Sequence, residues 1–426
     1  MSGSKEAATA NLFEIISNSG GSSFDVRSGS PRIEYRESMI DDTIRLSVAI
    51  VDTGQSGLSA AEALKLQGGE KVKFKYTDAA GNSLDFSNGE WLRLSHKTFE
   101  VRSFKSSSFI AQIVAKEFLD NKLLEKRVLK RYSGKISETV GSILKDDLKT
   151  DKNLDISETT NKFSDFGLRR EPYEVILELQ QIAIPNVKGS NGKTAGFFFW
   201  QTAKGFHFKS ADEIFNGKPT KKYIYNFKVD DQIPAGYTDK LLDFKAKRVI
   251  DVEKQLDYGA FGTATETFNY ASQVFKKDVP LLADSDSKIW SGKEPPNYGE
   301  YFQKPSVVFA TPEAIGMAYG TGDPIKQQLD KSKEENFNVS ETIAQAMQNY
   351  RQRLNFMYEA IIPGDFSLHA GDIIQCDVPE LSDKTTPVRS PKDSGIYMIL
   401  ELCHYISPTK TYTGLVLVKD SFGVKV

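Results

Sequence analysis

The stretch SGIYMILELCHYI at residues 394–406 decides how this chain is interpreted, because it has the length and composition of a long β-strand. Alternate residues along a strand point to opposite faces. One face would carry Ile396, Met398, Leu400 and Leu402, and the other Tyr397, Ile399 and Cys403. Since both faces are apolar, the strand is expected inside a barrel or between packed layers.

Similar strands surround this one in the last 75 or so residues. The runs are LNFMYEAIIPG at 354–364, DFSLHAGDIIQCDVP at 365–379 and TYTGLVLVKDSFG at 411–423. Each ends at Gly, Pro, Asp or Ser, the residues that favour turns. No catalytic constellation lies among them, so this end of the chain is interpreted as a scaffold.

The N-terminal part also reads as β after a disordered tail at 1–10. Short alternating runs between 11 and 119, with the hairpin signal DAAGN at 78–82, predict a first barrel or sandwich. The run SAAEALKL at 59–66 predicts one short helix.

Residues 120–215 change character and predict an inserted α/β module. Helical spacing at 137–149 follows Ser137 as the expected N-cap, and a second helix spans 170–184 with Pro172 near its start. A strand, a turn, a strand and a short helix follow at 192–215. The aromatic run at 197–200 is interpreted mainly as a strand buried on both faces, with a binding platform as the alternative.

The chain then returns to β at 216–245, is mixed at 246–345 with a helix at 339–354, and ends in the strands at 346–426. This order implies a second, discontinuous barrel at 216–245 and 346–426. The fold class is therefore α+β, mainly β, with two barrel domains and two inserted modules. The two β-rich units are interpreted as a diverged internal duplication.

Composition excludes several function classes. The 426 residues carry 55 basic and 57 acidic side chains, a net charge of −2, which is not the basic surface of a dedicated nucleic-acid binder. The two cysteines, Cys376 and Cys403, are expected to be reduced and buried. No signal peptide and no membrane-spanning run is evident, so the protein is expected to stay in the cytoplasm or to leave by lysis.

Candidate catalytic motifs are weak. Asp52 lies in IVDTG, similar to an aspartic-protease loop, but that chemistry needs two such carboxylates and the chain has one DTG. The segment at 189–194 lacks the first glycine of a phosphate loop and leads into a strand. The four histidines, His96, His207, His369 and His404, have no zinc spacing. No catalytic residue, metal site or cofactor is predicted.

The pattern resembles the baseplate hub protein of T-even-type contractile-tailed bacteriophages. Three stretches carry the resemblance: residues 45–76, residues 170–215 and residues 350–423. The match covers most of 30–425 and is weak over 216–345. The positions that match the family's turns and strands are Asp52, Gly69, Glu70, Gly364, Leu368, Gly371, Tyr397 and His404.

The resemblance implies a structural role in the virion tail. Family members form homotrimers in which each subunit has two domains similar to the tail-tube barrel. The resulting pseudo-sixfold ring joins the hexameric tail tube to the trimeric central spike, and it contacts baseplate wedge proteins. Assembly would take place in the host cytoplasm, with no membrane partner and no specific nucleic acid. The alternatives are a phage-entry hydrolase of aspartic or glycosidase type and a surface-binding module.

Overall fold

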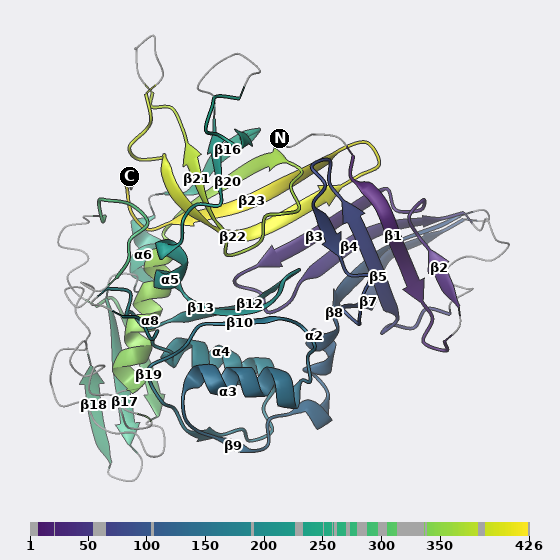
Figure 1. Cartoon of the computed structure of the whole chain (residues 1–426). Coiled ribbons are helices and arrows are strands. Elements are labelled where there is room, and N and C mark those ends of the chain that lie inside the picture. Colours follow the sequence, from purple (N-terminus) through teal and green to yellow (C-terminus); the bar gives the residue numbers. More distant parts are fainter. Residues whose placement is uncertain are drawn as a thin grey trace.

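The computed structural model describes residues 7–20, 22–53, 65–103, 106–188, 191–225, 233–249, 251–257, 259, 262–269, 273–278, 288–296, 305–312, 336, 339–381 and 388–424. In Figure 1 the N-terminal strands (purple) and the C-terminal strands (yellow) form the upper part of the molecule, and the helices of the α/β module lie below them. The helix predicted at 59–66 falls almost entirely outside the described residues.

The first β unit follows the alternation that the sequence predicted. In β4 (Arg45–Asp52), Leu46, Val48 and Ile50 are buried and the residues before each are half-buried. The other strands are β1 (Thr9–Ile16), β2 (Ser23–Asp25), β3 (Arg32–Ser38), β5 (Lys71–Thr77), β6 (Ser83–Asp85), β7 (Leu92–Arg102) and β8 (Ser107–Ala115). Since β1 begins at Thr9, order starts inside the tail expected at 1–10. The hairpin predicted at 78–82 joins β5 to β6.

The second β unit combines two distant parts of the chain. Its strands are β14 (Lys221–Ile224), β15 (Asp239–Lys240), β16 (Asp243–Arg248), β20 (Phe356–Pro363), β21 (Ile373–Asp377), β22 (Gly395–Ile406) and β23 (Thr411–Lys419). The last four strands confirm the runs predicted from the C-terminal sequence. The strands from 221–248 and from 356–419 hydrogen-bond to one another, in the pairs β14–β21 and β16–β20.

Both units arrange five strands in the same order. The path β3-β4-β8-β7-β5 in the first unit corresponds to β16-β20-β23-β22-β21 in the second, and the corresponding strands also follow the same order along the chain. All neighbouring pairs in both paths are antiparallel. The outermost strands differ, because β1 runs antiparallel to β5 whereas β14 runs parallel to β21. The shared order supports an internal duplication.

The long strand β22 departs from the simple alternation predicted for it. Tyr397 and Ile399 pack in the main core together with Leu402, whereas Met398 and Leu400 pack in a separate cluster. The prediction that Leu402 shares a face with Met398 and Leu400 is therefore wrong. The register with β23 shifts after Ile399, so Leu400 is the extra residue of a β-bulge, and the bulge exchanges the faces of the residues that follow.

The α/β module follows the first β unit directly. Its elements are α2 (Lys116–Asp120), η1 (Leu124–Lys126), β9 (Arg131–Tyr132), α3 (Ile136–Ser142), η2 (Ile143–Asp147), β10 (Leu154–Ile156), β11 (Asp165–Phe166), α4 (Pro172–Ile182), β12 (Phe197–Thr202), β13 (Gly205–Ser210) and α5 (Ala211–Asn216). The predicted N-cap at Ser137 is wrong: the cap is Lys135, and the Ser137 hydroxyl instead accepts a hydrogen bond from the Thr159 N–H. Pro172 opens α4 as predicted.

The mixed module contains α6 (Val252–Asp257), β17 (Thr263–Asn269), β18 (Val274–Asp278), β19 (Val307–Pro312) and α8 (Val339–Arg353). Its three strands form a small sheet in the order β18-β17-β19. Helix α8, predicted from the spacing at 339–354, packs against α4 of the α/β module and against β17. None of the helices in the described ranges has the length and apolar character that would span a bilayer.

The fold class, α+β and mainly β, is confirmed. The strands of both units belong to one hydrogen-bonded sheet, and within the described residues neither unit closes on itself as a barrel. Edge strands with unpaired N–H and C=O groups attract further strands. How the two units use their edges therefore decides what the molecule can assemble with.

Candidate assembly interface

The two β units are joined by a strand ladder between β3 and β22. Six residue pairs run from Ser38–Glu401 to Ile33–Ile406, and the strands are antiparallel. On the same edge of β22, residues 395–398 pair with β21. β3, the edge strand of the first unit, therefore pairs with the part of β22 that lies beyond the end of β21. A single sheet extends across both units.

Glu37, at the end of β3, lies under this ladder with only 1% of its surface exposed. Its carboxylate accepts hydrogen bonds from the Tyr35 hydroxyl at 2.6 Å and from the Ala203 and Ala370 N–H groups, both at 2.9 Å. The His369 Nδ1 atom lies 3.0 Å away. These partners belong to β3, to the turn between β12 and β13, and to the loop before β21. Glu37 therefore ties both β units and the α/β module together at one point.

Glu37 and His369 form a buried ion pair. Burial by itself raises the pKa of Glu37, but the His369 charge and the hydrogen bonds to the carboxylate outweigh it and hold the pKa at about 2. Burial lowers the pKa of His369, yet the Glu37 carboxylate raises it above its ordinary value of 6.5. Removing one partner of such a pair leaves an uncompensated charge in the core.

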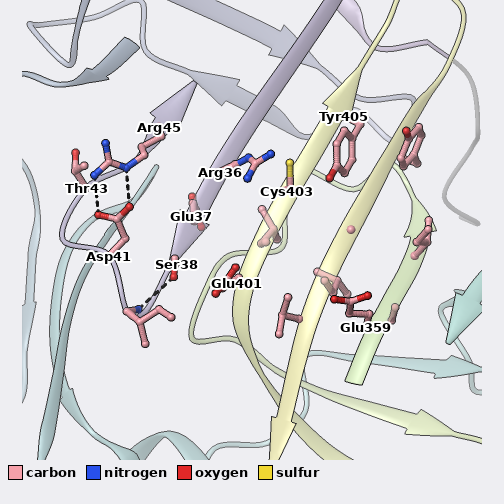
Figure 2. A pocket seen from close by; sticks show the side chains of 18 residues that line it. Arg36, Glu37, Ser38, Asp41, Thr43, Arg45, Glu359, Glu401, Cys403 and Tyr405 are labelled. Atoms are coloured by element: carbon pink, nitrogen blue, oxygen red, sulfur yellow. Dashed lines mark hydrogen bonds and ion pairs between the residues drawn. The ribbon is translucent and has the colours of Figure 1, made fainter. Parts of the chain in front are cut away.

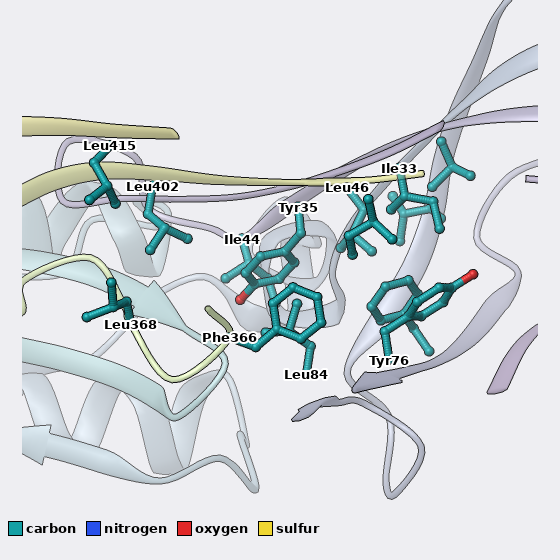
Figure 3. Packing of buried hydrophobic residues seen from close by; sticks show 14 of the residues in the cluster. Ile33, Tyr35, Ile44, Leu46, Tyr76, Leu84, Phe366, Leu368, Leu402 and Leu415 are labelled. Atoms are coloured by element: carbon teal, nitrogen blue, oxygen red, sulfur yellow. The ribbon is translucent and has the colours of Figure 1, made fainter. Parts of the chain in front are cut away.

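Aromatic packing continues the core across the boundary. Tyr35 of the first unit stacks on His404 of β22, with ring centroids 5.8 Å apart, and Phe366 meets His404 edge-on at 4.9 Å. His404 Nδ1 lies 2.8 Å from the Thr413 hydroxyl, and burial lowers its pKa to about 3, so the ring is neutral. Figure 3 shows Tyr35, Phe366 and Leu402 as members of one buried cluster.

Two further hydrogen bonds cross the same boundary. The Phe366 N–H donates to the Asp78 carboxylate at 2.8 Å, and Asp78 also accepts bonds within its own turn between β5 and β6. The Ala8 N–H donates to the Thr411 hydroxyl at 2.9 Å. The two units are therefore fixed by a ladder, a shared core and side-chain bonds at several places.

The opposite face of the junction carries a shallow groove of about 750 Å³ (Figure 2). Its charged and polar lining includes Arg36, Asp41, Arg45, Glu359, Glu401 and Tyr405. Asp41 and Arg45 form an ion pair at 2.6 Å beside it. Cys403 also lies here, on the face that the bulge gives it, and burial raises the pKa of its thiol to about 11. The thiol is thus protonated and a poor nucleophile at neutral pH.

A second buried charge cluster holds the inserted modules to the C-terminal strand. Arg353 at the end of α8 is fully buried; its Nη2 atom lies 2.5 Å from Asp212 of α5, and it also pairs with Asp420 just after β23. Asp420 accepts hydrogen bonds from the Ser291 N–H at 2.9 Å and hydroxyl at 2.8 Å. Burial raises the pKa of Asp420, but Arg353 and Lys288 together hold it at about 2.

Three of the family-like positions lie in the first unit. Gly69 has a φ of +85°, and its N–H bonds the Leu94 carbonyl at 2.7 Å. The Glu70 carboxylate is buried and accepts the Gln67 N–H at 2.7 Å, which closes the turn before β5. Asp52 is buried at the end of β4, opposite Ser107 of β8. The remainder of the DTG motif, from Gly54 on, lies outside the described residues.

Of the other five positions, Gly364, Leu368 and Gly371 lie in the loop between β20 and β21, and Tyr397 and His404 lie on β22. Gly364 and Gly371 allow close packing, because a Cβ added to them would lie 2.6 Å from Thr411 Cγ2 and 2.5 Å from Trp200 Cζ2. Leu368 and Tyr397 are fully buried in the main core, and the Tyr397 ring packs against Tyr358 with centroids 5.4 Å apart. These five positions shape turns and core packing, and His404 lies in the part of β22 that pairs with β3.

The sequence interpretation missed Glu37 and Arg353 as organising residues. Glu37 lies on the inward face of β3, two residues after Tyr35 and four after Ile33, so alternation gave a signal of an inward-facing carboxylate. Arg353 follows Val339, Ala346 and Asn349 at helical spacing on one buried stripe of α8. In both cases the pattern located a buried charge, but the partner came from a distant part of the chain.

The aromatic run, His207 and the turn before β12 have structural roles in the described residues. Phe197, Phe198, Phe199 and Trp200 are each at most 5% exposed, which supports the interpretation as a strand buried on both faces. His207 stacks on Trp200 with ring centroids 4.9 Å apart. Residues 191–196 lead into β12, as expected of a turn. Across the described ranges no group of three or more His, Cys, Asp or Glu side chains is arranged to hold a metal ion.

Comparisons with known proteins reveal similarity in structure. No family model and no curated protein sequence matches the chain. A tail protein from Neisseria meningitidis MC58 aligns over 96% of both chains with a TM-score of 0.53 and 8% identity. A 43 kDa tail protein of prophage MuSo2 from Shewanella oneidensis aligns over 96% of this chain and 99% of its own, with a TM-score of 0.54 and 7% identity. The chain has the fold of these tail proteins, which confirms at the level of fold the resemblance seen in the sequence.

Proposed function

We propose that this protein is the structural hub of a phage tail baseplate, a homotrimeric ring that adapts a sixfold tail tube to a threefold central spike. The observation that carries the proposal is the repeated five-strand order of the two β units, which are joined into one sheet by the β3–β22 ladder. A chain with two similar units gives three copies six similar positions around an axis. The fold shared with two tail proteins, one of them from a prophage, supports the virion setting.

In this ring, the sheet face that carries the groove faces away from the central channel. The groove lining mixes acidic and basic side chains and is open, as suits a surface in contact with water. The α/β module packs on this same face of the sheet, where Phe198 and Trp200 share a cluster with Met398, and Val416 contacts both this cluster and the groove. The inserted modules therefore lie outside, in reach of baseplate wedge proteins, and the ends of the ring contact the tube and the spike.

The proposed role requires no catalysis. The buried acids Glu37, Asp212 and Asp420 are all engaged by hydrogen-bond donors or cations. They stabilise the contacts between modules, and each is only 1% exposed. The protein would act in the tail of a contractile virion during entry, as a fixed adaptor, after assembly in the host cytoplasm.

Solution mass tests the proposal. Light scattering across a concentration series is expected to give three times the 47.5 kDa chain mass, about 142.5 kDa. Because an adaptor ring can need its partner to close, the series is repeated with the spike protein present. A particle that stays monomeric or dimeric under both conditions would rule out the trimeric hub.

A further inference from the structure

β22 shows how an edge strand from another unit is accepted. Along the edge opposite β23, β21 pairs with residues 395–398 and β3 pairs with residues 401–406. The bulge at Leu400 lies between the two partners. A bulge bends and twists the strand locally, so residues 401–406 of β22 turn away from β21 and can pair with a different strand.

β7, the counterpart of β22 in the first unit, is built in the same way. On the edge of β7 opposite β8, β5 pairs with Leu92 and Arg93. The last backbone hydrogen bonds on that edge join Leu94 to Gly69 and Glu70. The register with β8 then shifts after Leu94, at the position that corresponds to the bulge in β22. Beyond it, residues 96–98 and 101–102 pair with β8 on one side, with a second register shift between Thr98 and Val101, and no ladder partner lies on the other side in the part of the chain that the structure describes.

β16, the counterpart of β3, is the matching edge strand. It pairs with β20 on one side, as β3 pairs with β4 but with a register shift between Ala246 and Arg248, and within the described ranges its other edge has no ladder partner. Lys245 and Lys247 have side chains 69% and 49% exposed. Lysines along an open edge discourage indiscriminate strand pairing, so such an edge suits one specific partner.

Exposed apolar side chains gather on the outer part of β7. Phe99 is 81% exposed and Val101 66% exposed, although both lie within a strand. In Figure 1 this part of the β7–β8 hairpin projects away from the rest of the molecule. Large apolar groups on an unpaired, projecting edge are typical of a surface that another chain covers.

We infer that β16 of one copy pairs antiparallel with residues 96–101 of β7 in the next copy, which repeats between chains the β3–β22 ladder found within the chain. This inference rests on the proposed trimer and names the contact that closes it. Three internal ladders and three ladders between copies then alternate around the ring, and the sheet has no free edge at these positions.

The correspondence between the units also gives the register. Within the chain, Arg36 of β3 pairs with Cys403 of β22. Alignment of β7 with β22 at their bulges puts Thr98 at the position of Cys403. Alignment of the β16–β20 ladder with the β3–β4 ladder puts Arg248 at the position of Arg36. Thr98 of one copy therefore faces Arg248 of the next, and Lys245 lies beside the segment that contains Glu100.

Disulfide trapping tests this register in the full-length chain. Directly opposed residues of antiparallel strands are close enough for a disulfide, so a chain carrying Thr98→Cys and Arg248→Cys is expected to form a covalent trimer under mild oxidation. The product is read on a non-reducing gel and disappears with reductant. Each single variant is a control. A second control combines Arg248→Cys with Arg93→Cys, because β5 already occupies the edge at Arg93.

The outcomes separate the pairing from the ring itself. If the wild type has the mass of a trimer but the Thr98→Cys/Arg248→Cys variant forms no disulfide between copies, the proposed strand pairing is wrong and the trimeric ring still stands. A wild-type monomer, with and without the spike, overturns both. Equal trapping in the Arg93 control overturns the register. Should the variants fold poorly, hydrogen exchange on the wild-type trimer decides: amides on the open edges of 96–101 and 243–248 are expected to be protected, and rapid exchange there contradicts the pairing.

Discussion

Glu37 contributes to stability through partners in three parts of the fold. Replacing it by Ala leaves the charge of His369 buried and the N–H groups of Ala203 and Ala370 without their acceptor. We expect Glu37→Ala to lower the free energy of unfolding by about 3–5 kcal/mol in urea titration. Glu359→Ala is the control: that side chain is half exposed and pairs with Lys247 at the surface, so its loss costs less than about 1 kcal/mol. Equal losses would contradict the role of Glu37.

The Glu37–His369 pair also makes stability depend on pH in a defined direction. The folded-state pKa of His369 lies above 6.5, so its stabilising effect is complete below pH 6.5 and is lost as the pH rises through the folded value. Glu37, with a folded pKa of about 2 against an ordinary 4.5, contributes above pH 4.5 and loses its effect as the pH falls towards 2. The stability difference between wild type and His369→Gln should therefore be larger at about pH 5.5 than at about pH 9. A difference that grows with pH would show that His369 is not the charged partner.

At the scale of elements, the loop between β20 and β21 depends on the contact of Gly371 with Trp200 of β12. Gly371 has a φ of +91°, and an added Cβ would lie 2.5 Å from Trp200 Cζ2. Gly81 offers a matched control, since its φ is +90° and nothing lies within 4 Å of an added Cβ. Both Ala variants pay about 1–2 kcal/mol of backbone strain, and Gly371→Ala is expected to lose about 1–3 kcal/mol more from the clash. Equal unfolding midpoints for the two variants would refute the contact.

Element type was largely predictable from the sequence, whereas local register was not. The alternation of β4, the hairpin at 78–82, α4 behind Pro172 and the buried aromatic strand all follow from side-chain pattern and turn chemistry. The bulge at Leu400 could not be predicted in this way, because an extra residue is defined only by the pairing of β22 with β23. The N-cap at Ser137 failed because its hydroxyl serves a tertiary contact with Thr159. Where a distant segment competes for a group, local propensity is overruled.

At the scale of the whole molecule, the two β-rich units were evident in the sequence, but the way they join was not. The β3–β22 ladder links residues more than 350 positions apart. The five-strand order shared by the two units becomes visible only once the strand pairing is known. The family-like positions Gly364, Gly371 and His404 were identified as turn and strand residues, and the structure places them at that junction. Glu37 and Arg353 carried a pattern of inward-facing charge whose partners a single sequence does not reveal.

Electron cryo-microscopy of the full-length protein, alone and with its spike partner, tests the central claim most directly. We expect a ring of three copies in which six similar β units surround a channel, with continuous sheet density across the boundaries within and between chains. The β3–β22 ladder provides the internal reference in the same map. Particles that contain one or two copies, or a trimer whose copies meet through the inserted modules without sheet contact, would contradict it.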